Sequence, residues 1–533
     1  MSHYNIIIIG GGISGLYLAY KLQKSNNKIL LLERSSELGG RIRTEKIGET
    51  IIEMGAARFS NKHKLLLKLL KKLNLEDKKI ELPKNIDFYY KNKKIKYDLY
   101  KKIKNIVSKK KKYKNDYLKK INLYQYCEEI LGKEEASKFQ DMFGYDAEFI
   151  KLNAYSALNM FQEDLLEGES KYYILNGGLI QIIDKLEELC EKSKNITIIK
   201  ESIVKEIKKN KVIVETETKD KIYKCSKIAL TIPLLDLKKF EMFEDYEYIN
   251  KIKEIPLLRI YARYPLDKNN KPWFHDIKRT ITDNHIRQII PINYDDGVVM
   301  ISYTDLYSAE YWNNYCSSGE KKLTEKIKDE ISILFNKEIP DPLEYKFYYW
   351  KAGVHMWKTN TDMDIMYNKI LNPFDNIYIS NEAFSKHQCW IEGSLGMVED
   401  LIKKLKNKKK KKTIQKGGKK KKQKKDKRTK KIKKFPIEKV LKKKNWIIFE
   451  HGKQKRIYKI MPKWFKEHPG GKSYLKQGIK ANSFYNKKDN NRSDKSPIQL
   501  FKSIGAHGSS DILKKYIINS GRPDIIIFIG LLK

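Results

Sequence analysis

The hydrophobic pattern near the N-terminus changes its period twice within a short stretch. The apolar run Tyr4–Ile9 leads into three glycines, which predicts a buried strand that meets a tight turn. Apolar residues then recur at helical spacing over Ile13–Leu22, and a second apolar run, Lys28–Glu33, ends in an acid. We therefore expect a strand–helix–strand unit at the start of the chain.

The rest of the pattern predicts a mixture of helices and strands up to about residue 405. Residues 83–165 are helix-rich, and residues 196–232 and 255–304 have the short apolar runs of strands. Further helices are expected at Lys62–Leu75, from the Gly177-Gly178 pair to Cys190, at Ser318–Asn336 and at Glu392–Leu405, with a further strand at Ile377–Ser380. This succession indicates an α/β fold.

The charge is concentrated in a lysine tract, Lys403–Lys434. The chain has 110 Lys and Arg against 66 Asp and Glu, a formal net charge of +44, and the tract holds 21 basic residues and one acid, Asp426. It has almost no large apolar residue, so it cannot bury enough surface to offset its ordering entropy. We expect a disordered linker. It is either a solvated tether or a binder of an anionic partner (a nucleic acid or a membrane surface), or it directs the protein to the nucleus.

The remaining composition is that of an intracellular globular protein. A hydrophobic fraction of 41% is enough for a sizeable core. No run approaches the roughly 20 apolar residues that span a bilayer, so we expect no transmembrane segment. The five cysteines form no CxxC pair, and the first residues do not resemble a secretion signal. We expect a reducing, cytoplasmic location.

The glycines after the first strand have the spacing of a dinucleotide site. Gly10 allows the tight turn, Gly12 lets the backbone approach a pyrophosphate, and Gly15 allows close packing of helix on strand. The N-terminus of the following helix provides N–H donors to the phosphates. Glu33 ends the second strand, where a carboxylate accepts the ribose hydroxyls, which favours FAD or NAD over NADP.

The residues after Glu33 resemble a known family. Leu38-Gly39-Gly40-Arg41 is similar to the extended FAD signature of the flavin amine oxidase superfamily, which includes monoamine, polyamine and L-amino-acid oxidases and the related protoporphyrinogen oxidases and desaturases. Further segments up to residue 402 resemble motifs of that superfamily, namely Glu53–Arg58, Asn176–Gly178, Ile377–Glu382 and Trp390–Ser394. The resemblance implies an FAD-binding Rossmann-like domain with a mixed α+β substrate domain.

The same resemblance implies a set of cofactor residues. They are Gly10, Gly12, Gly15, Glu33, Arg34, Gly40, Arg41, Arg58, Val204, Glu382 and Glu392. Arg34 stands one position before the usual family arginine, and Val204 lies where a family strand contacts adenine. Val354 stands where some members attach the flavin through a cysteine, which implies non-covalent FAD.

The resemblance also implies residues for the chemistry. Trp390 and His355 fall near the two aromatic positions that frame the amine in front of the flavin, and a histidine there can accept a proton near neutral pH. Arg259 lies close to a family lysine that holds a water near flavin N5. In amino-acid oxidases the arginine that matches Arg58 clamps a substrate carboxylate; otherwise it faces the flavin or a structural acid.

A second motif lies near the C-terminus. His468-Pro469-Gly470-Gly471 resembles the HPGG haem motif of cytochrome b5, and His507 lies in a segment that resembles the one carrying the second axial ligand. Two imidazoles on either side of the iron saturate it, which favours electron transfer over oxygen chemistry. The resemblance implies a small α+β cytochrome b5-like domain that binds haem b.

Together these features predict an FAD-dependent oxidoreductase fused to a haem domain. We expect the FAD-binding domain at 1–85, 170–235 and 345–402, the substrate domain at 86–169 and 236–344, the linker at 403–434 and the haem domain at 435–533. An amine, a polyamine or an amino acid is oxidised to an imine by hydride transfer to the flavin, and the electrons pass to O2 or to the haem.

Two groups of alternatives stay open at the level of sequence. The first is another enzyme of the flavin superfamily: an L-amino-acid oxidase, a protoporphyrinogen oxidase or desaturase, or a sugar mutase. The second is a basic nucleic-acid or membrane binder whose redox domains are vestigial.

Overall fold

The computed structural model describes residues 3–168, 170–217, 219–421, 434–435, 446–451, 454–460 and 526–532. The chain divides into two compact units, Met1–Lys412 and Thr413–Lys533. The division falls inside the lysine tract. The finer division of the first unit into FAD-binding and substrate domains stays a prediction.

A five-stranded parallel sheet carries the N-terminal glycines. Its strand order is β11-β3-β2-β15-β21. The strands are β2 (Ile6–Ile9), β3 (Ile29–Leu32), β11 (Ile196–Ile199), β15 (Ile228–Leu230) and β21 (Ile377–Ile379). β2 and β3 are apolar and buried along their whole length, as expected of parallel strands covered on both faces. Helix α1 (Ile13–Leu22) joins β2 to β3, so the expected strand–helix–strand unit is confirmed.

Three smaller sheets extend this region. The first has the order β1-β14-β13-β12 and consists of β1 (His3–Tyr4), β12 (Val204–Lys208), β13 (Lys211–Val214) and β14 (Lys221–Cys225). The second has the order β6-β10-β7 and consists of β6 (Phe59–Ser60), β7 (Lys79–Glu81) and β10 (Tyr172–Leu175). The third is the hairpin of β4 (Thr44–Ile47) and β5 (Thr50–Glu53).

A seven-stranded sheet forms the other half of the first unit. Its order is β20-β16-β19-β18-β17-β8-β9. The strands are β8 (Ile86–Tyr90), β9 (Lys93–Ile95), β16 (Ile252–Arg263), β17 (Arg279–Thr282), β18 (Gln288–Asn293), β19 (Val298–Asp305) and β20 (Glu344–Trp357). All neighbours are antiparallel except β17 and β8. Helices α11 (Leu306–Ser317) and α12 (Glu320–Phe335) pack their buried residues into one apolar cluster with this sheet.

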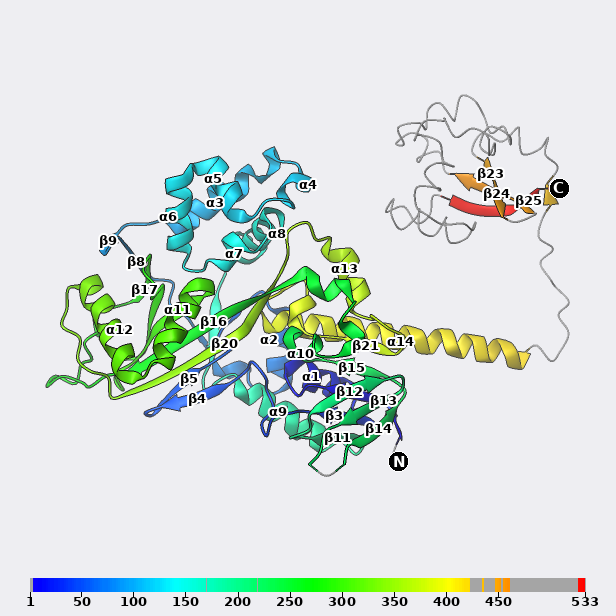
Figure 1. Cartoon of the computed structure of the whole chain (residues 1–533), viewed down its shortest axis with the longest axis horizontal. Helices are drawn as coiled ribbons and strands as arrows, with labels where there is room; N and C mark the ends of the chain where they lie inside the picture. Colours follow the sequence, from blue (N-terminus) through cyan, green and yellow to red (C-terminus); the bar gives the residue numbers. More distant parts are fainter. Residues whose placement is uncertain are drawn as a thin grey trace. The chain divides into compact units, whose positions relative to one another are not determined.

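A group of short helices forms a separate lobe, seen at the top of Figure 1. It consists of α3 (Leu99–Lys109), α4 (Asn115–Leu118), α5 (Leu123–Leu131), α6 (Lys133–Phe143), α7 (Ala147–Ile150) and α8 (Ala154–Met160). Their apolar faces form one cluster around Tyr126, Phe139 and Phe149, which are fully buried. The helix-rich prediction for residues 83–165 is confirmed, with β8 and β9 in addition.

The remaining helices cover the parallel sheet and its edges. They are α2 (Lys64–Lys72), α9 (Ile180–Glu191), α10 (Leu234–Leu237), α13 (Met363–Ile370) and α14 (Ile391–Lys421). α14 begins at Ile391 as expected but continues through residues 403–421, where we expected a disordered linker. Lysine has a high helix propensity, so an existing helix can extend into a lysine run.

The second unit is described only in part. Its strands β22 (Lys434–Phe435), β23 (Trp446–His451), β24 (Gln454–Ile460) and β25 (Ile526–Leu532) form a sheet of order β22-β25-β24-β23. The predicted haem ligands His468 and His507 lie outside the described residues. The cytochrome b5-like fold therefore stays a prediction.

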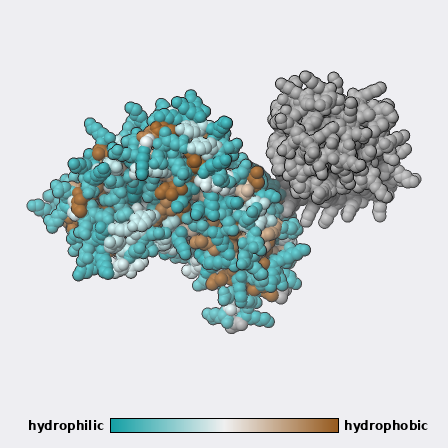
Figure 2. Space-filling view, turned by 45° about the horizontal axis from the view of Figure 1, so that its top comes forward, coloured by the Kyte–Doolittle hydropathy of each residue, from teal (hydrophilic) through white to brown (hydrophobic). Residues whose placement is uncertain are grey.

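The exterior of the described residues is largely hydrophilic. On the face seen in Figure 2, hydrophobic residues form small separate groups. Within the described residues, none of the helices combines the length and the apolar character that crossing a membrane requires. The same residues contain no cluster of three or more His, Cys, Asp or Glu side chains that could hold a metal ion.

Candidate active site

A large cavity runs through the first unit, from the glycine turn after β2 to the underside of β17. Its volume is about 1600 Å³. One part is lined by the expected dinucleotide residues, including Gly12, Glu33 and Val204, and the other by residues of the seven-stranded sheet and the helical lobe, including Arg279 and Glu148. The cavity therefore joins the two regions that the sequence assigned to cofactor and substrate.

The glycine turn has the geometry that its sequence predicts. Gly10 has φ +106°, and a Cβ on Gly15 would lie 2.0 Å from the carbonyl oxygen of Gly10. Both positions therefore require glycine for the fold itself. A Cβ on Gly12 would meet only the carbonyl oxygen of Gly39, at 3.7 Å. Gly12 caps helix α1, so the open space in front of it lies at a helix N-terminus, where a pyrophosphate binds well.

Glu33 lies at the end of β3, next to this turn. One carboxylate oxygen accepts a hydrogen bond from the backbone N–H of Gly11 at 2.6 Å, and the other accepts from the N–H of Ser35 at 3.0 Å. These bonds orient the carboxylate beside the cavity, where a ribose would lie. Arg34 also lines the cavity, and its guanidinium forms an ion pair with Asp236 at 2.9 Å.

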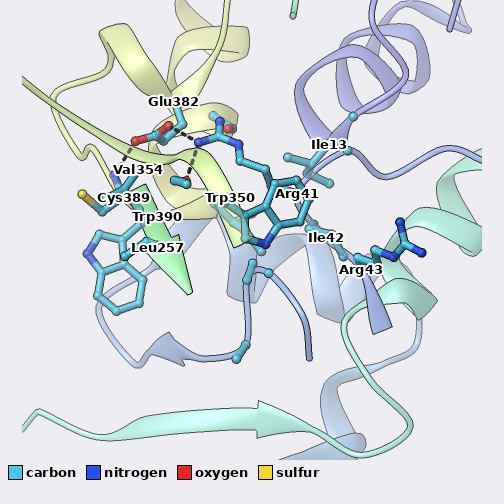
Figure 3. Close-up of a pocket in the computed structure, with 18 of the residues that line it drawn as sticks. Ile13, Arg41, Ile42, Arg43, Leu257, Trp350, Val354, Glu382, Cys389 and Trp390 are labelled. Carbon is cyan, nitrogen blue, oxygen red and sulfur yellow. Dashed lines mark hydrogen bonds and ion pairs between the residues drawn. The ribbon is translucent and has the colours of Figure 1, made fainter. Parts of the chain in front are cut away.

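A buried ion pair joins the second FAD motif to the C-terminal motif. Arg41 Nη1 lies 2.8 Å from Glu382 Oε2 and also donates to the carbonyl oxygen of Gly353 at 2.9 Å (Figure 3). The second oxygen of Glu382 accepts from the backbone N–H of Cys389 at 2.6 Å. Burial alone would raise the pKa of Glu382, but Arg41 and His355 outweigh it and hold the pKa at about 2.

His355 is placed differently from the expectation. Its neighbours Val354 and Met356 line the cavity, but His355 is fully buried beside Glu382, with Nδ1 2.9 Å from Glu382 Oε2. Successive side chains of a strand point to opposite faces. Because Val354 and Met356 point into the cavity, the ring of His355 between them points into the core. His355 therefore supports the ion pair and does not frame the substrate space.

Glu392 is also placed differently. It is not among the residues that line the cavity. Its two carboxylate oxygens accept hydrogen bonds from the backbone N–H groups of Leu65 and Leu66, at 2.9 and 3.0 Å. These N–H groups belong to the first turn of α2, where an acid is favourable. Glu392 thus attaches α2 to the start of α14, while its neighbours Trp390 and Ile391 line the cavity.

Two of the predicted chemical residues do line the cavity. The Trp390 ring stacks on Tyr172, with ring centroids 6.2 Å apart and an interplanar angle of 24°. Arg259 Nη1 donates to the carbonyl oxygen of Glu53 at 2.6 Å, and its guanidinium lies over the Tyr303 ring at 4.5 Å. The Trp390 ring and the Arg259 guanidinium form two walls of the part of the cavity away from the FAD motifs, which we call the substrate part.

Several residues that line the substrate part of the cavity could not be predicted from the sequence. Arg279 begins β17, Tyr145 lies between α6 and α7, and Glu148 lies in α7. None belongs to a motif, and each comes from a segment that sequence reasoning assigned only to a substrate domain. A buried-strand pattern that starts with an arginine was the one available hint for Arg279.

A family model for flavin containing amine oxidoreductases matches residues 13–396 of this chain. The matched span begins directly after Gly12 and includes residues from both parts of the cavity. This chain belongs to that family. Its members use FAD, so the open turn at Gly12 and the carboxylate of Glu33 fit the cofactor that the family implies.

The chain is also similar to individual proteins. An uncharacterised protein of Acanthamoeba polyphaga mimivirus is 23% identical over 480 residues, which cover 75% of this chain and 93% of the relative. An L-amino-acid oxidase of Sistrurus catenatus edwardsii is 35% identical over 71 residues, which cover 13% of this chain and 14% of the relative. A crystal structure of a putrescine oxidase mutant aligns with a TM-score of 0.61 and 14% identity, over 75% of this chain and 99% of the other. The last comparison supports the fold alone.

Proposed function

We propose that this protein is an FAD-dependent oxidase that converts an amine to an imine with O2 as the electron acceptor. The observation that carries the proposal is the continuous cavity between the glycine turn at Gly12 and the walls formed by Trp390 and Arg259. The span that matches the oxidoreductase family begins directly after Gly12 and includes both of these walls. Such a cavity lets one end hold the cofactor and the other hold a substrate.

The residues of the first part of the cavity suit FAD. Gly12 and the N-terminus of α1 would hold the pyrophosphate, and Glu33 would accept hydrogen bonds from the ribose hydroxyls. Ile203, next to Val204, is 52% exposed and lines the cavity, which suits an adenine ring lying on it. When bound, FAD supplies the two-electron oxidation of the amine.

The chain's own residues have other tasks. Trp390 and Tyr172 form an apolar wall that excludes water and orients the reacting carbon. In the balanced reaction, one amine and one O2 give one imine and one hydrogen peroxide. The α-carbon loses its hydrogen, the nitrogen loses one proton, and O2 takes up both electrons and both protons. Water then hydrolyses the imine to a carbonyl compound and ammonia.

A direct test uses the purified full chain. We expect a yellow protein whose flavin absorption bleaches anaerobically when the right amine is added, and which releases one hydrogen peroxide per imine in air. The panel should include simple amines, polyamines and amino acids. A protein that neither binds FAD nor forms hydrogen peroxide with any member of the panel would contradict the proposal.

A haem domain as a second electron acceptor is also proposed. It rests on the HPGG motif at His468 and on His507, and on no contact in the described residues. Two histidine ligands would give a low-spin haem that accepts one electron at a time. The covalent tether of the lysine tract would keep this domain at a high effective concentration near the flavin unit.

The lysine tract itself suggests an anionic partner and a cytoplasmic or nuclear location. Its 21 basic residues would release counterions on binding nucleic acid, so binding should weaken steeply with salt. Gel-shift measurements with duplex DNA, with and without residues 403–434, test this. Equal binding by both forms would remove the tract from consideration.

A further inference from the structure

Among the described residues, three arginines that line the cavity have no acidic partner. Arg259 is held by the carbonyl oxygen of Glu53 and lies over the Tyr303 ring, which leaves Arg58 and Arg279 as candidates for binding a substrate. Arg58 follows β5, and its Nη2 donates to the hydroxyl of Tyr145 at 2.9 Å, while the guanidinium lies over the rings of Tyr145 and Tyr172 at 5.9 and 5.6 Å. Arg279 Nη2 donates to Gln288 Oε1 at 2.8 Å, and its Nε is buried without a partner. In the part of the chain that the structure describes, neither guanidinium has a carboxylate within ion-pair distance.

The two charges also act on each other. Burial, followed by the nearby positive charge of Arg58, lowers the pKa of Arg279 to about 10. Both residues line the same cavity. Two like charges in a poorly solvated place repel each other strongly unless anions balance them. The fold therefore maintains a local excess of positive charge that it does not compensate itself.

Glu148 and Asp305, two of the acids that line the cavity, form no ion pair with Arg58 or Arg279. Burial and the neighbouring Asp305 raise the pKa of Glu148 to about 8, so Glu148 is mainly neutral at pH 7. Burial raises the pKa of Asp305 to about 6, so Asp305 is mainly charged at pH 7, but its oxygens accept hydrogen bonds from the backbone N–H groups of Asp146 and Ala147 at 2.9 to 3.1 Å, and the positive charge that acts on it is that of Arg287. A substrate with a positive side chain would be repelled by the guanidiniums of Arg58 and Arg279.

We propose that the substrate is an acidic amino acid whose side-chain carboxylate pairs with Arg279, while Arg58 takes the α-carboxylate, the role that the resemblance to amino-acid oxidases already implies for it. The inference rests on the proposed amine oxidation. The assignment of the two carboxylates follows from position: the segment of Arg58 contacts the FAD motif, since the N–H of Ala56 donates to the carbonyl oxygen of Arg41 at 2.9 Å. Arg279 lies on β17, which belongs to the other sheet.

A guanidinium presents a fork of N–H donors that matches a carboxylate. Two such forks select a molecule with two carboxylates, as in aspartate or glutamate. An amide side chain at the second fork would leave the Arg279 charge unbalanced. Discrimination between acid and amide is therefore expected to be large, about 100-fold or more, because a site built for one polar partner rejects an analogue that leaves it unpaired.

The test compares L-glutamate and L-aspartate with L-glutamine, L-leucine and putrescine in a hydrogen peroxide assay on the FAD-loaded full chain. We expect one of the two acids to have the highest kcat/KM, with a preference over L-glutamine of about 100-fold that Arg279→Gln lowers to less than about 10-fold. Arg279→Lys should retain part of the preference. Arg263→Gln, which removes a surface arginine paired with Asp296, is the control and should leave the preference unchanged.

A binding measurement separates this inference from the oxidase proposal. Glutarate has both carboxylates but no amine, and butyrate has one, so calorimetric titration with each reports the anion site without turnover. We expect glutarate to bind about 10-fold more tightly than butyrate or better, and Arg279→Gln to abolish the difference. Arg279-dependent glutarate binding without oxidation of any amine would support the anion site and contradict the oxidase. Equal binding of glutarate and butyrate by the unmodified protein, or higher kcat/KM for putrescine or L-leucine, would overturn the inference.

Discussion

Arg41 and Glu382 are 341 residues apart in sequence, yet their side chains form an ion pair of 2.8 Å. The pair fastens the loop after β3 to the segment after β21, and both segments line the cofactor part of the cavity. His355 completes the group from β20. A contact among three distant segments makes the cofactor site depend on the whole first unit.

Removing the charge of Glu382 should therefore damage both stability and cofactor binding. Glu382→Gln leaves the half-buried Arg41 guanidinium without its anion, and we expect the free energy of unfolding to fall by about 3 kcal/mol. Thermal unfolding and the FAD content of the purified protein measure the two effects. Asp364→Asn breaks the exposed pair with Lys386 and should cost less than about 1 kcal/mol. Equal effects of the two variants would argue against a special role for the pair.

The same pair predicts a loss of stability in acid. The pKa of Glu382 in the folded protein, about 2, lies below its ordinary value of 4.5. The carboxylate therefore stabilises the fold above pH 4.5, and this contribution is lost as the pH falls from 4.5 towards 2. Urea unfolding at a series of pH values should show the decline, and Glu382→Gln should flatten it. An unchanged slope in the variant would assign the acid sensitivity to other groups.

Glu148 should make the protein less stable as the pH rises, the opposite of the effect of Glu382. Its pKa in the folded protein, about 8, lies above its ordinary value of 4.5, because burial disfavours the charged form. The neutral carboxyl is tolerated at low pH, and its contribution to stability is lost as the pH rises from 4.5 through 8. Glu148→Gln cannot ionise, so its unfolding free energy should fall less between about pH 6 and pH 9 than that of the unmodified protein. Parallel pH curves for both proteins would contradict a raised pKa.

The glycine turn predicts two different outcomes for two similar substitutions. Gly15→Ala puts a Cβ 2.0 Å from the carbonyl oxygen of Gly10, so we expect a loss of stability of about 2 kcal/mol or more. Gly12→Ala has room within the protein, since the nearest atom is at 3.7 Å, so the fold should survive. Its methyl group would instead occupy the approach of the pyrophosphate and lower the FAD content. Circular dichroism and the ratio of flavin to protein absorbance distinguish the two results, and full FAD content in Gly12→Ala would contradict the assignment.

The haem proposal has a spectroscopic test of its own. We expect a Soret band in the purified full chain, which His468→Ala and His507→Ala each abolish or shift, because both axial ligands are needed for a low-spin haem. His275→Ala changes an exposed histidine of the first unit, outside the predicted haem domain, and serves as the control. A full chain expressed with added haem precursor but lacking any Soret band would remove haem from the mechanism.

Much of this protein was determined by local sequence. One strand–helix–strand unit contains the glycine turn at Gly10, Gly12 and Gly15 and the acid at Glu33. The hydrophobic period of this unit and the spacing of its glycines are therefore enough to predict the geometry of these residues. Helix α1 has the bounds that its apolar pattern indicates, Ile13–Leu22, and most of its residues are buried.

Other features were decided only by tertiary structure. The register of β20 decides which face of the strand His355 lies on. A shift of one residue would turn its side chain from the core to the cavity. Glu392 became the anchor of α2 because the first turn of that helix arrives at the start of α14. Arg58 lies in the loop between β5 and β6, and Arg279 begins β17, far away in sequence. Their charges therefore come together only once the chain has folded and both guanidiniums lie beside one cavity.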